Sequence, residues 1–197
     1  MGGRYRRGGD GRGRGGRSRG GGAGGAGADG VGSGRHDAYV NERTAAAYPV
    51  TVRPRIAEDL PGAAAALVRV HASDGYPVEG VADPVGWLRP EGLVGAWVAV
   101  VDGAVVGHVA VVEAGGPLVL VRLFVVREAR RDGAGKALVR AAEAFARERG
   151  RGLELEVLGK DRAAMRLYER LGWRRGGDLV HEFGDGERAM GARYVAP

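Results

Sequence analysis

Apolar residues recur along the chain at two different spacings from residue 50 onward. Alternating or continuous apolar runs, which are typical of strands, lie at 50–53, 96–101, 104–112, 118–126 and 153–157. Apolar positions at helical spacing mark 59–70, 134–149 and 161–171. Because the helices alternate with the strands, they are predicted to cover both faces of one sheet, and the fold class is α/β with a mixed sheet.

Turn and cap residues support these boundaries. Asp102-Gly103 lies between two apolar runs, is a type I′ turn signal and predicts a β-hairpin. Asp59 is predicted to cap the first helix, and Asp83 to cap a short helix that opens at the next residue. A last hairpin is predicted to turn near Gly184-Asp185-Gly186.

The segment after one long apolar strand has the chemistry of a phosphate-binding turn. It reads Arg130-Arg131-Asp132-Gly133-Ala134-Gly135-Lys136-Ala137, and a helix begins inside it. Free backbone N–H groups and the positive end of a helix dipole meet at such a turn, and its glycines allow close approach of a ligand. The segment lacks the Ser or Thr of a P-loop and the glycine spacing of a dinucleotide fingerprint, which excludes both motifs.

Two motifs, in this order, resemble the GNAT superfamily of N-acetyltransferases. The coenzyme signature of that family, Arg/Gln-x-x-Gly-x-Gly/Ala, is matched by Arg130, Gly133 and Gly135. Its last block, Leu-Tyr-x-x-x-Gly-Phe, is matched by Leu167 to Trp173. The resemblance implies a GNAT-like mixed sheet with helices on both faces, acetyl-CoA as co-substrate, and an enzyme that transfers the acetyl group to an amine.

The resemblance also gives roles to individual residues. Tyr168 corresponds to the tyrosine that protonates the departing thiolate, and a phenol with a reference pKa of about 10 suits that task. A packing role beside Met165 and Leu171 is the alternative for this tyrosine. The pantetheine arm and the phosphates of the coenzyme are expected to contact a larger group of residues: Phe124, Val125, Arg130, Arg131, Asp132, Gly133, Ala134, Gly135, Lys136, Ala137 and Asp161.

Two of these positions depart from the family pattern. Arg131 replaces a common glycine and adds charge near the phosphates, and Asp161 replaces a frequent asparagine. A carboxylate at this second position can still cap the helix that follows it. Neither change removes a backbone donor, so the coenzyme site is predicted to be intact.

Acetyl transfer requires a base for the amine and a proton for the thiolate. Along 153–157 the leucines and the valine share one face and both glutamates share the other. The resemblance places a base at Glu156, and a solvent-facing glutamate is the alternative. His181 is a lesser candidate, and His108, which lies among apolar neighbours, is interpreted as structural.

The absence of cysteine narrows the chemistry. Without a thiol the chain cannot form a cysteine acyl-enzyme, so direct attack of the amine in a ternary complex is predicted. Four dispersed histidines with no cysteine give no metal-ligand spacing, so no metal is expected.

The resemblance also implies that the acceptor amine contacts the segment after the first helix and the C-terminal hairpin, here His71–Leu93 and Trp173–Val195. A small-molecule amine, a peptide N-terminus and a protein lysine all stay open as acceptors. Carboxylates and aromatic residues in the two segments favour a cationic amine: Asp74, Tyr76, Glu79, Asp83, Trp87, Glu182 and Asp185.

Arginine and glycine are concentrated at the N-terminus. Residues 1–36 hold eight arginines and two aspartates, which accounts for the whole net charge of +6. With almost no apolar residue to bury, residues 1–45 are predicted to form a disordered Gly/Arg-rich tail before a GNAT domain at 46–197. The tail is either an arm that binds nucleic acid or an extension left by an early translation start.

The remaining hypotheses concern location and partners. No apolar run reaches the length of a membrane span, and no apolar segment follows the N-terminal arginines as in a secretory signal. A cytoplasmic protein without a membrane partner is therefore predicted, and a homodimer is left open. Two other functions stay open as well: a non-catalytic coenzyme A-binding module, and nucleic-acid binding through the tail.

Overall fold

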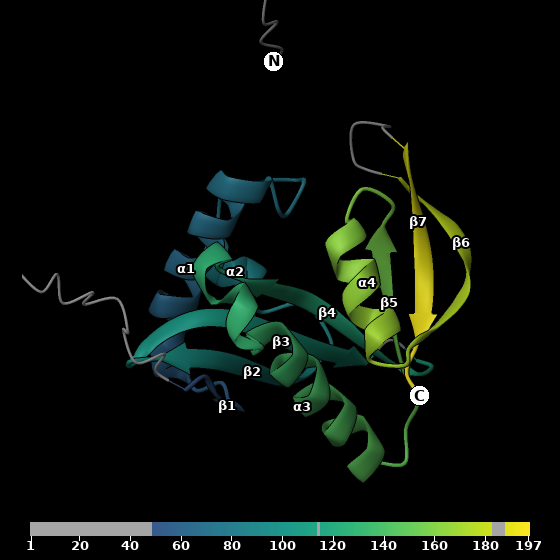
Figure 1. Cartoon of the computed structure of the whole chain (residues 1–197), viewed down its shortest axis with the longest axis horizontal. Coiled ribbons are helices and arrows are strands. Elements are labelled where there is room, and N and C mark those ends of the chain that lie inside the picture. Colours follow the sequence, from purple (N-terminus) through teal and green to yellow (C-terminus); the bar gives the residue numbers. More distant parts are fainter. Residues whose placement is uncertain (1–48, 114, 183–187) are drawn as a thin grey trace, which may run out of the picture. The chain divides into compact units, whose positions relative to one another are not determined.

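The computed structural model describes residues 49–113, 115–182 and 188–197. Within these ranges the chain forms a seven-stranded sheet with the strand order β1-β2-β3-β4-β5-β7-β6 (Figure 1). The fold class predicted from the sequence is confirmed. The predicted N-terminal tail and the turn near residues 184–186 lie outside the described residues, so the boundary at residue 45 stays a prediction.

The elements follow the predicted boundaries closely. The strands are β1 Thr51–Pro54, β2 Leu93–Val101, β3 Ala104–Glu113, β4 Leu118–Val125, β5 Leu153–Leu158, β6 Arg174–Glu182 and β7 Arg188–Val195. The helices are α1 Leu60–Asp74, α2 Pro84–Trp87, α3 Ala134–Glu148 and α4 Arg162–Arg170.

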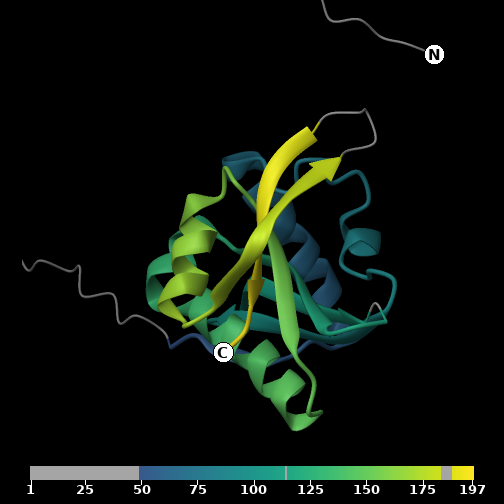
Figure 2. The same cartoon turned by 90° about the vertical axis from the view of Figure 1, so that its right-hand side faces the viewer.

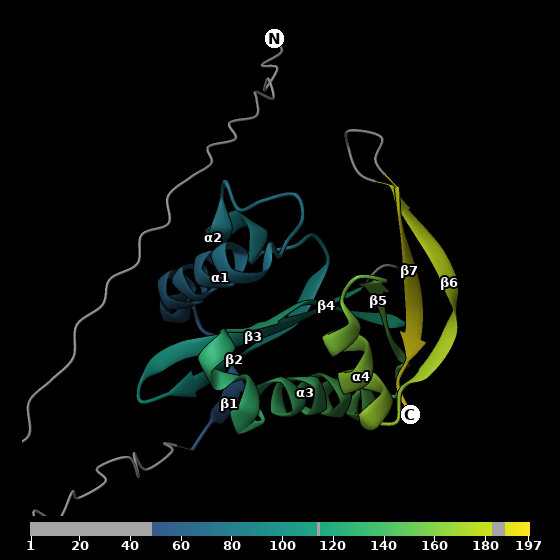
Figure 3. The same ribbon diagram turned by 45° about the horizontal axis from the view of Figure 1, so that its top comes forward.

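Helices cover both faces of the sheet. Figure 3 shows α1 and α2 on one side of the strands and α3 and α4 on the other. The amphipathic helix α3 buries Leu138, Val139 and Ala142 against the sheet, while Phe145 at the edge of the same stripe meets Trp97 with ring centroids 5.1 Å apart. Burial of these apolar side chains is the main favourable contribution to folding in such a layer.

The start of the first helix differs from the prediction. Asp59 does not cap α1, because it lies with helical backbone angles in a 3₁₀ turn that precedes the helix. Its buried carboxylate instead accepts two hydrogen bonds from the guanidinium of Arg53, at 2.6 and 2.7 Å, and one from the N–H of Ile56 at 2.8 Å. The pair with Arg53 lowers the pKa of Asp59.

Two local predictions are confirmed. Asp83 caps α2, since its carboxylate accepts a hydrogen bond from the N–H of Gly86 at 2.9 Å. Asp102 and Gly103 have φ angles of 48° and 74°, as the two central residues of a type I′ turn require, and they connect β2 to β3.

The strands β4 and β5 are joined over a very short length. Their parallel ladder contains only Leu118 opposite Leu153 and Val119 opposite Glu154, within the part of the chain that the structure describes. Beyond these pairs the two strands diverge (Figure 1). We call this point of divergence the fork. On its far side β7 lies between β5 and β6, so the C-terminal strands extend the sheet (Figure 2, yellow).

A bulge in β4 lies close to the fork. The register with β3 shifts between His108, which pairs with Phe124, and Ala110, which pairs with Val121. Arg122 lies in the bulge with φ 57°, a conformation that residues other than glycine rarely adopt. The bulge therefore changes the direction in which the side chain of this arginine points.

Candidate active site

The turn that is predicted to bind phosphate lies directly before α3, where the sequence placed it. Gly133 has φ 81° and directly precedes α3, so a residue with a Cβ would be strained at this position. The first α-helical hydrogen bond runs from the N–H of Ala137 to the carbonyl of Gly133 at 3.0 Å. The three N–H groups before it, from Ala134 to Lys136, lie outside the helical ladder and give this end of α3 its affinity for anions.

Gly135 has a packing role in addition to the expected coenzyme contact, which stays a prediction. A Cβ at this position would lie 3.5 Å from Leu167 of α4 and 3.9 Å from Val125 of β4. The side without a side chain therefore faces the protein interior. Gly135 lets the start of α3 pack closely against α4, and its backbone N–H stays available to a ligand.

Arg130, expected at the coenzyme phosphates, is held by protein groups. Its Nε donates to the carbonyl of Val125 at 3.0 Å, and its NH2 forms an ion pair with Asp74 at the end of α1. Asp74 also accepts from Arg127 at 2.9 Å. The guanidinium groups of Arg130 and Arg127 lower the pKa of Asp74 to about 2, and Arg130 has the larger effect. Asp74, one of the expected acceptor-binding acids, thus ties α1 to the phosphate-binding turn.

Tyr168 is buried at the fork side of α4. Its side chain is 5% exposed and packs against the rings of Trp173 and Tyr194, with centroids 5.5 and 6.0 Å away. Burial, with smaller contributions from Tyr76 and Asp161, raises the pKa of Tyr168 well above its ordinary value. The phenol therefore carries its proton at neutral pH, as a proton donor must.

Asp161 precedes α4 but does not cap it. Its carboxylate makes no capping hydrogen bond, so this part of the prediction is wrong, and the helix starts with the backbone bond from Met165 N–H to the Asp161 carbonyl at 3.1 Å. The side chain is half-buried, and burial raises the pKa of Asp161.

Glu156 points away from α4. Leu155 pairs with Tyr194, whose ring packs on Tyr168 of α4, so the next residue of β5 must face the side of α1 and α2. The alternation of buried leucines and accessible glutamates predicted for this strand is confirmed.

His181 of β6 lies near this glutamate. Its Nε2 is 3.9 Å from Oε2 of Glu156 and has no hydrogen-bond partner among the described residues. The imidazole covers Gly191 of β7, where a Cβ would lie only 2.9 Å from the ring. The glycine thus makes room for a histidine beside the expected base.

His108 is structural, as interpreted from the sequence. It is fully buried and stacks on Phe124 with ring centroids 5.5 Å apart. Nε2 lies 2.9 Å from NH1 of Arg55, which can only donate, so Nδ1 carries the proton and donates to the Arg122 carbonyl at 3.2 Å. Burial lowers the pKa of His108 to about 4, so the ring is neutral at physiological pH.

Arg122 is the residue that sequence reasoning missed. Its guanidinium carbon lies 4.2 Å from the ring centroid of Trp87, and its NH1 is buried without a hydrogen-bond partner among the described residues. The signal was present in the sequence, since Arg122 is the only charged residue of an otherwise apolar strand.

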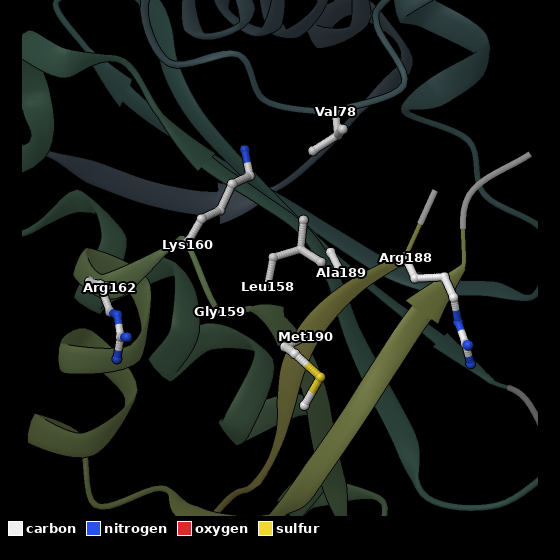
Figure 4. Close-up of a pocket in the computed structure, with 8 residues that line it drawn as sticks. All are labelled: Val78, Leu158, Gly159, Lys160, Arg162, Arg188, Ala189 and Met190. Carbon is white, nitrogen blue, oxygen red and sulfur yellow. The ribbon is translucent and has the colours of Figure 1, made fainter. Parts of the chain in front are cut away.

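A pocket of about 440 Å³ opens at the end of β5 (Figure 4). Figure 4 shows Lys160 extending toward Val78, which comes from the loop after α1, with Met190 of β7 on the opposite side. The lining residues are Val78, Leu158, Gly159, Lys160, Arg162, Arg188, Ala189 and Met190. Three of them are cationic and none of the described lining residues is acidic, in contrast to the expected preference for a cationic amine.

Comparison with known proteins agrees with this architecture. The acetyltransferase (GNAT) family model matches residues 65–173, more than half of the chain. The probable N-acetyltransferase camello of Xenopus tropicalis is 38% identical over 96 residues, and the match covers 44% of each protein. The chain thus spans less than half the length of this relative.

Solved structures share the fold. The ribosomal-protein-S18-alanine N-acetyltransferase from Escherichia coli superposes with a TM-score of 0.61 at 23% identity, covering 75% of this chain and 93% of that one. NAA60 of Arabidopsis thaliana in complex with acetyl-CoA gives a TM-score of 0.58 at 21% identity, covering 74% and 98%.

The chain belongs to the GNAT acetyltransferase family. The acetyl donor that this membership implies is acetyl-CoA. In the part of the chain that the structure describes, no helix is long and apolar enough to span a bilayer.

Proposed function

We propose that the protein is an N-acetyltransferase that transfers the acetyl group of acetyl-CoA to an amine by direct attack in a ternary complex. The observation that carries the proposal is the fork. The start of α3 and Tyr168 of α4 lie on one face of the sheet and Glu156 of β5 faces the other, so a coenzyme arm that passes between the separating strands β4 and β5 would lie between the proposed acid and the proposed base.

The residues at the fork fit the coenzyme. The N–H groups from Ala134 to Lys136 can hold the pyrophosphate, and the exposed cations Arg131 and Lys136 add charge beside them. Beyond Val119, β4 has no ladder partner toward β5 within the described residues. The backbone of Phe124 and Val125 can therefore pair with the pantetheine amides as an added strand would.

The proposed chemistry uses two side chains. The amine nitrogen attacks the thioester carbonyl, a C–N bond forms, and the C–S bond breaks. Glu156 takes the proton from the amine, directly or through water, and Tyr168 gives its proton to the departing sulfur. Since the sequence holds no cysteine, no cysteine thioester intermediate can form on the protein.

A charge reversal tests the coenzyme site. Lys136→Glu places a carboxylate at the start of α3 on an exposed side chain, so the fold survives while phosphate is repelled. We expect the Kd for acetyl-CoA in calorimetry to rise at least about tenfold. Arg147→Glu makes the same charge change at the exposed far end of α3 and serves as control.

Three outcomes separate the alternatives. Equal affinity in the two variants would place the phosphates elsewhere. Tight binding without turnover against any amine would indicate a coenzyme A-binding module instead of an enzyme. A stoichiometric acetyl adduct of the protein, detected by mass spectrometry and competent to react with amine, would exclude direct attack.

A further inference from the structure

Arg122 is positioned by the backbone of β4 and not by an ion pair. The bulge turns its side chain toward the face of α1 and α2, where the guanidinium stacks on Trp87 of α2. The carbonyl of Arg122 is held by His108, which is in turn held by Arg55. A planar group fixed by stacking keeps its N–H edge in a defined direction.

One edge of this guanidinium has no partner inside the protein. Its NH1 is buried, and no described residue accepts a hydrogen bond from it. Burial lowers the pKa of Arg122, in the direction expected for a charge that is partly removed from water. A buried donor on a charged group that lacks an acceptor is rare in folded proteins and calls for an explanation such as a bound ligand.

The nearby acids are engaged elsewhere. Glu79 accepts from the indole N–H of Trp87 at 3.3 Å, Asp83 caps α2, and Asp74 pairs with arginines of the phosphate-binding turn. Arg122 forms no ion pair with a described residue, and Glu79, whose charge acts on the guanidinium, is exposed and accepts its hydrogen bond from Trp87.

Arg122 lies within range of the proposed chemistry. Tyr76 packs edge-on against Trp87 with ring centroids 5.8 Å apart. Trp87, on which Arg122 stacks, also packs against Phe124 with ring centroids 6.3 Å apart. Because the backbone of Phe124 is proposed to pair with the pantetheine arm, a ligand atom bound to Arg122 would lie beside the proposed transfer site.

The pocket at the end of β5 adds independent support. Lys160, Arg162 and Arg188 line it, with no carboxylate among its described lining residues. Val78, on the same loop as Tyr76, forms its opposite wall (Figure 4). The positive charge of this pocket favours the approach of an anionic molecule over that of a simple cationic amine.

We propose that the acceptor is an amine that also carries a carboxylate, and that Arg122 binds this carboxylate. The inference rests on the proposed acetyltransferase function. Arginine presents two parallel N–H donors that match the two oxygens of a carboxylate, and the pairing is strong where water is excluded. Binding of the carboxylate at Arg122 directs the amine of the acceptor toward the acetyl group.

The test compares acceptors that differ in whether they carry a carboxylate. The full-length protein is assayed with acetyl-CoA and with phenylalanine, leucine, glutamate and lysine, each beside its primary amide and its decarboxylated amine. Peptide amides beginning Ala-Glu or Ala-Gln distinguish a side-chain carboxylate from that of a free amino acid. We expect the carboxylate member of a pair to have a kcat/KM about 10- to 100-fold higher.

Variants of Arg122 connect this preference to the guanidinium. Arg122→Gln is expected to remove most of the preference for the acid while keeping activity toward the amide, and Arg122→Lys to retain part of it. Arg151→Gln, which removes an exposed arginine paired with Glu113, is the control and is expected to leave the preference unchanged. Melting temperatures verify that the variants are folded.

The outcomes separate failure of the inference from failure of the function. Wild-type protein that acetylates amides as well as acids overturns the carboxylate site alone. An Arg122→Gln variant whose KM for acetyl-CoA rises while the acid preference persists shows that the guanidinium serves the coenzyme, and this also overturns the inference. Binding of acetyl-CoA with no acetylation of any amine overturns the proposed function and the inference with it.

Discussion

At the scale of single residues, burial decides which side chains can take part in proton transfer. Tyr168 and His108 are both buried, and burial favours the neutral form of each. For the tyrosine the neutral form is the proton donor, so burial suits the proposed role. In the neutral form of His108, both ring nitrogens are engaged, one with Arg55 and the other with the carbonyl of Arg122. The imidazole therefore has no free nitrogen with which to take or give a proton in catalysis.

Removal of one hydroxyl tests the role of Tyr168. Tyr168→Phe keeps the ring that packs on Trp173 and Tyr194, so the fold and the acetyl-CoA affinity are expected to persist. Loss of a general acid lowers kcat by about 10²- to 10⁴-fold. Pre-steady-state assays under conditions where chemistry limits the rate measure the effect, and a nearly unchanged kcat would make Tyr168 a packing residue only.

His108 gives the folded protein a specific pH dependence. The folded pKa of about 4 lies below the unfolded value of about 6.5, so the unfolded chain binds the extra proton between these pH values. Stability is therefore fully present above the unfolded pKa and falls as the pH drops through this window. Between pH 7 and 5 we expect a loss of about 2 kcal/mol in the free energy of unfolding.

Urea unfolding at both pH values measures this loss. His108→Gln can keep hydrogen bonds to Arg55 and to the Arg122 carbonyl but does not titrate, so its stability is expected to depend less on pH by that amount. Equal pH dependence of the two proteins would assign the effect to other groups.

The sequence pointed to some of the candidate site residues and not to others, and the reason is physical. Tyr168 and Glu156 lie in regular elements, where helical spacing and strand alternation fix the direction of a side chain. Arg122 lies in a bulge, which shifts the register by contacts with β3 that no local pattern records. Arg130 was recognisable by its motif, but its ion pair with Asp74 joins positions far apart in the chain.

At the scale of elements, the link between α1 and the turn before α3 adjusts the charge of the proposed coenzyme site. Asp74 pairs with Arg127 and Arg130, and its pKa of about 2 keeps it ionised throughout the physiological range. The acid thus neutralises part of the positive charge next to the start of α3. Arg130 keeps a second anchor at the Val125 carbonyl.

Replacement of this acid is expected to tighten coenzyme binding. Asp74→Asn retains the shape of the side chain and removes its charge, so the Kd for acetyl-CoA should fall about two- to fivefold at low salt and approach the wild-type value at high salt. Asp178→Asn, in an exposed pair with Arg175 on β6, controls for the loss of one surface carboxylate. Weaker binding in Asp74→Asn alone would mean that the acid positions the turn.

The elements themselves were largely predictable, and the exceptions are short or non-local. The hairpin at Asp102-Gly103 and the cap at Asp83 depend on residues a few positions apart, and both are confirmed. Asp59 lies in a 3₁₀ turn and does not cap α1, because its carboxylate pairs with Arg53 in the preceding strand. The insertion of β7 between β5 and β6 is a property of the whole sheet, and periodicity carries no information on strand order.

At the scale of the molecule, the sheet, the four helices and every proposed site residue lie within residues 49–197. A protein that begins at residue 46 is therefore expected to keep the melting temperature and the kcat/KM of the full chain to within about twofold. Thermal unfolding and the acetylation assay measure both quantities. Loss of activity in the shorter protein would show that the Gly/Arg-rich segment contributes to the enzyme. Salt-dependent RNA binding by the full chain but not by the shorter protein would support the nucleic-acid alternative.

The short ladder between β4 and β5 has a consequence beyond catalysis. Two residue pairs hold a four-stranded part and a three-stranded part of the sheet together along their strand edges. Where the ladder stops, both strands present backbone groups that another extended chain can pair with, which is the usual starting point of aggregation. A coenzyme arm bound along β4 would cover that edge. Bound acetyl-CoA would then protect the folded protein from aggregation. In a cell with little acetyl-CoA, both the substrate and the amount of folded protein would fall.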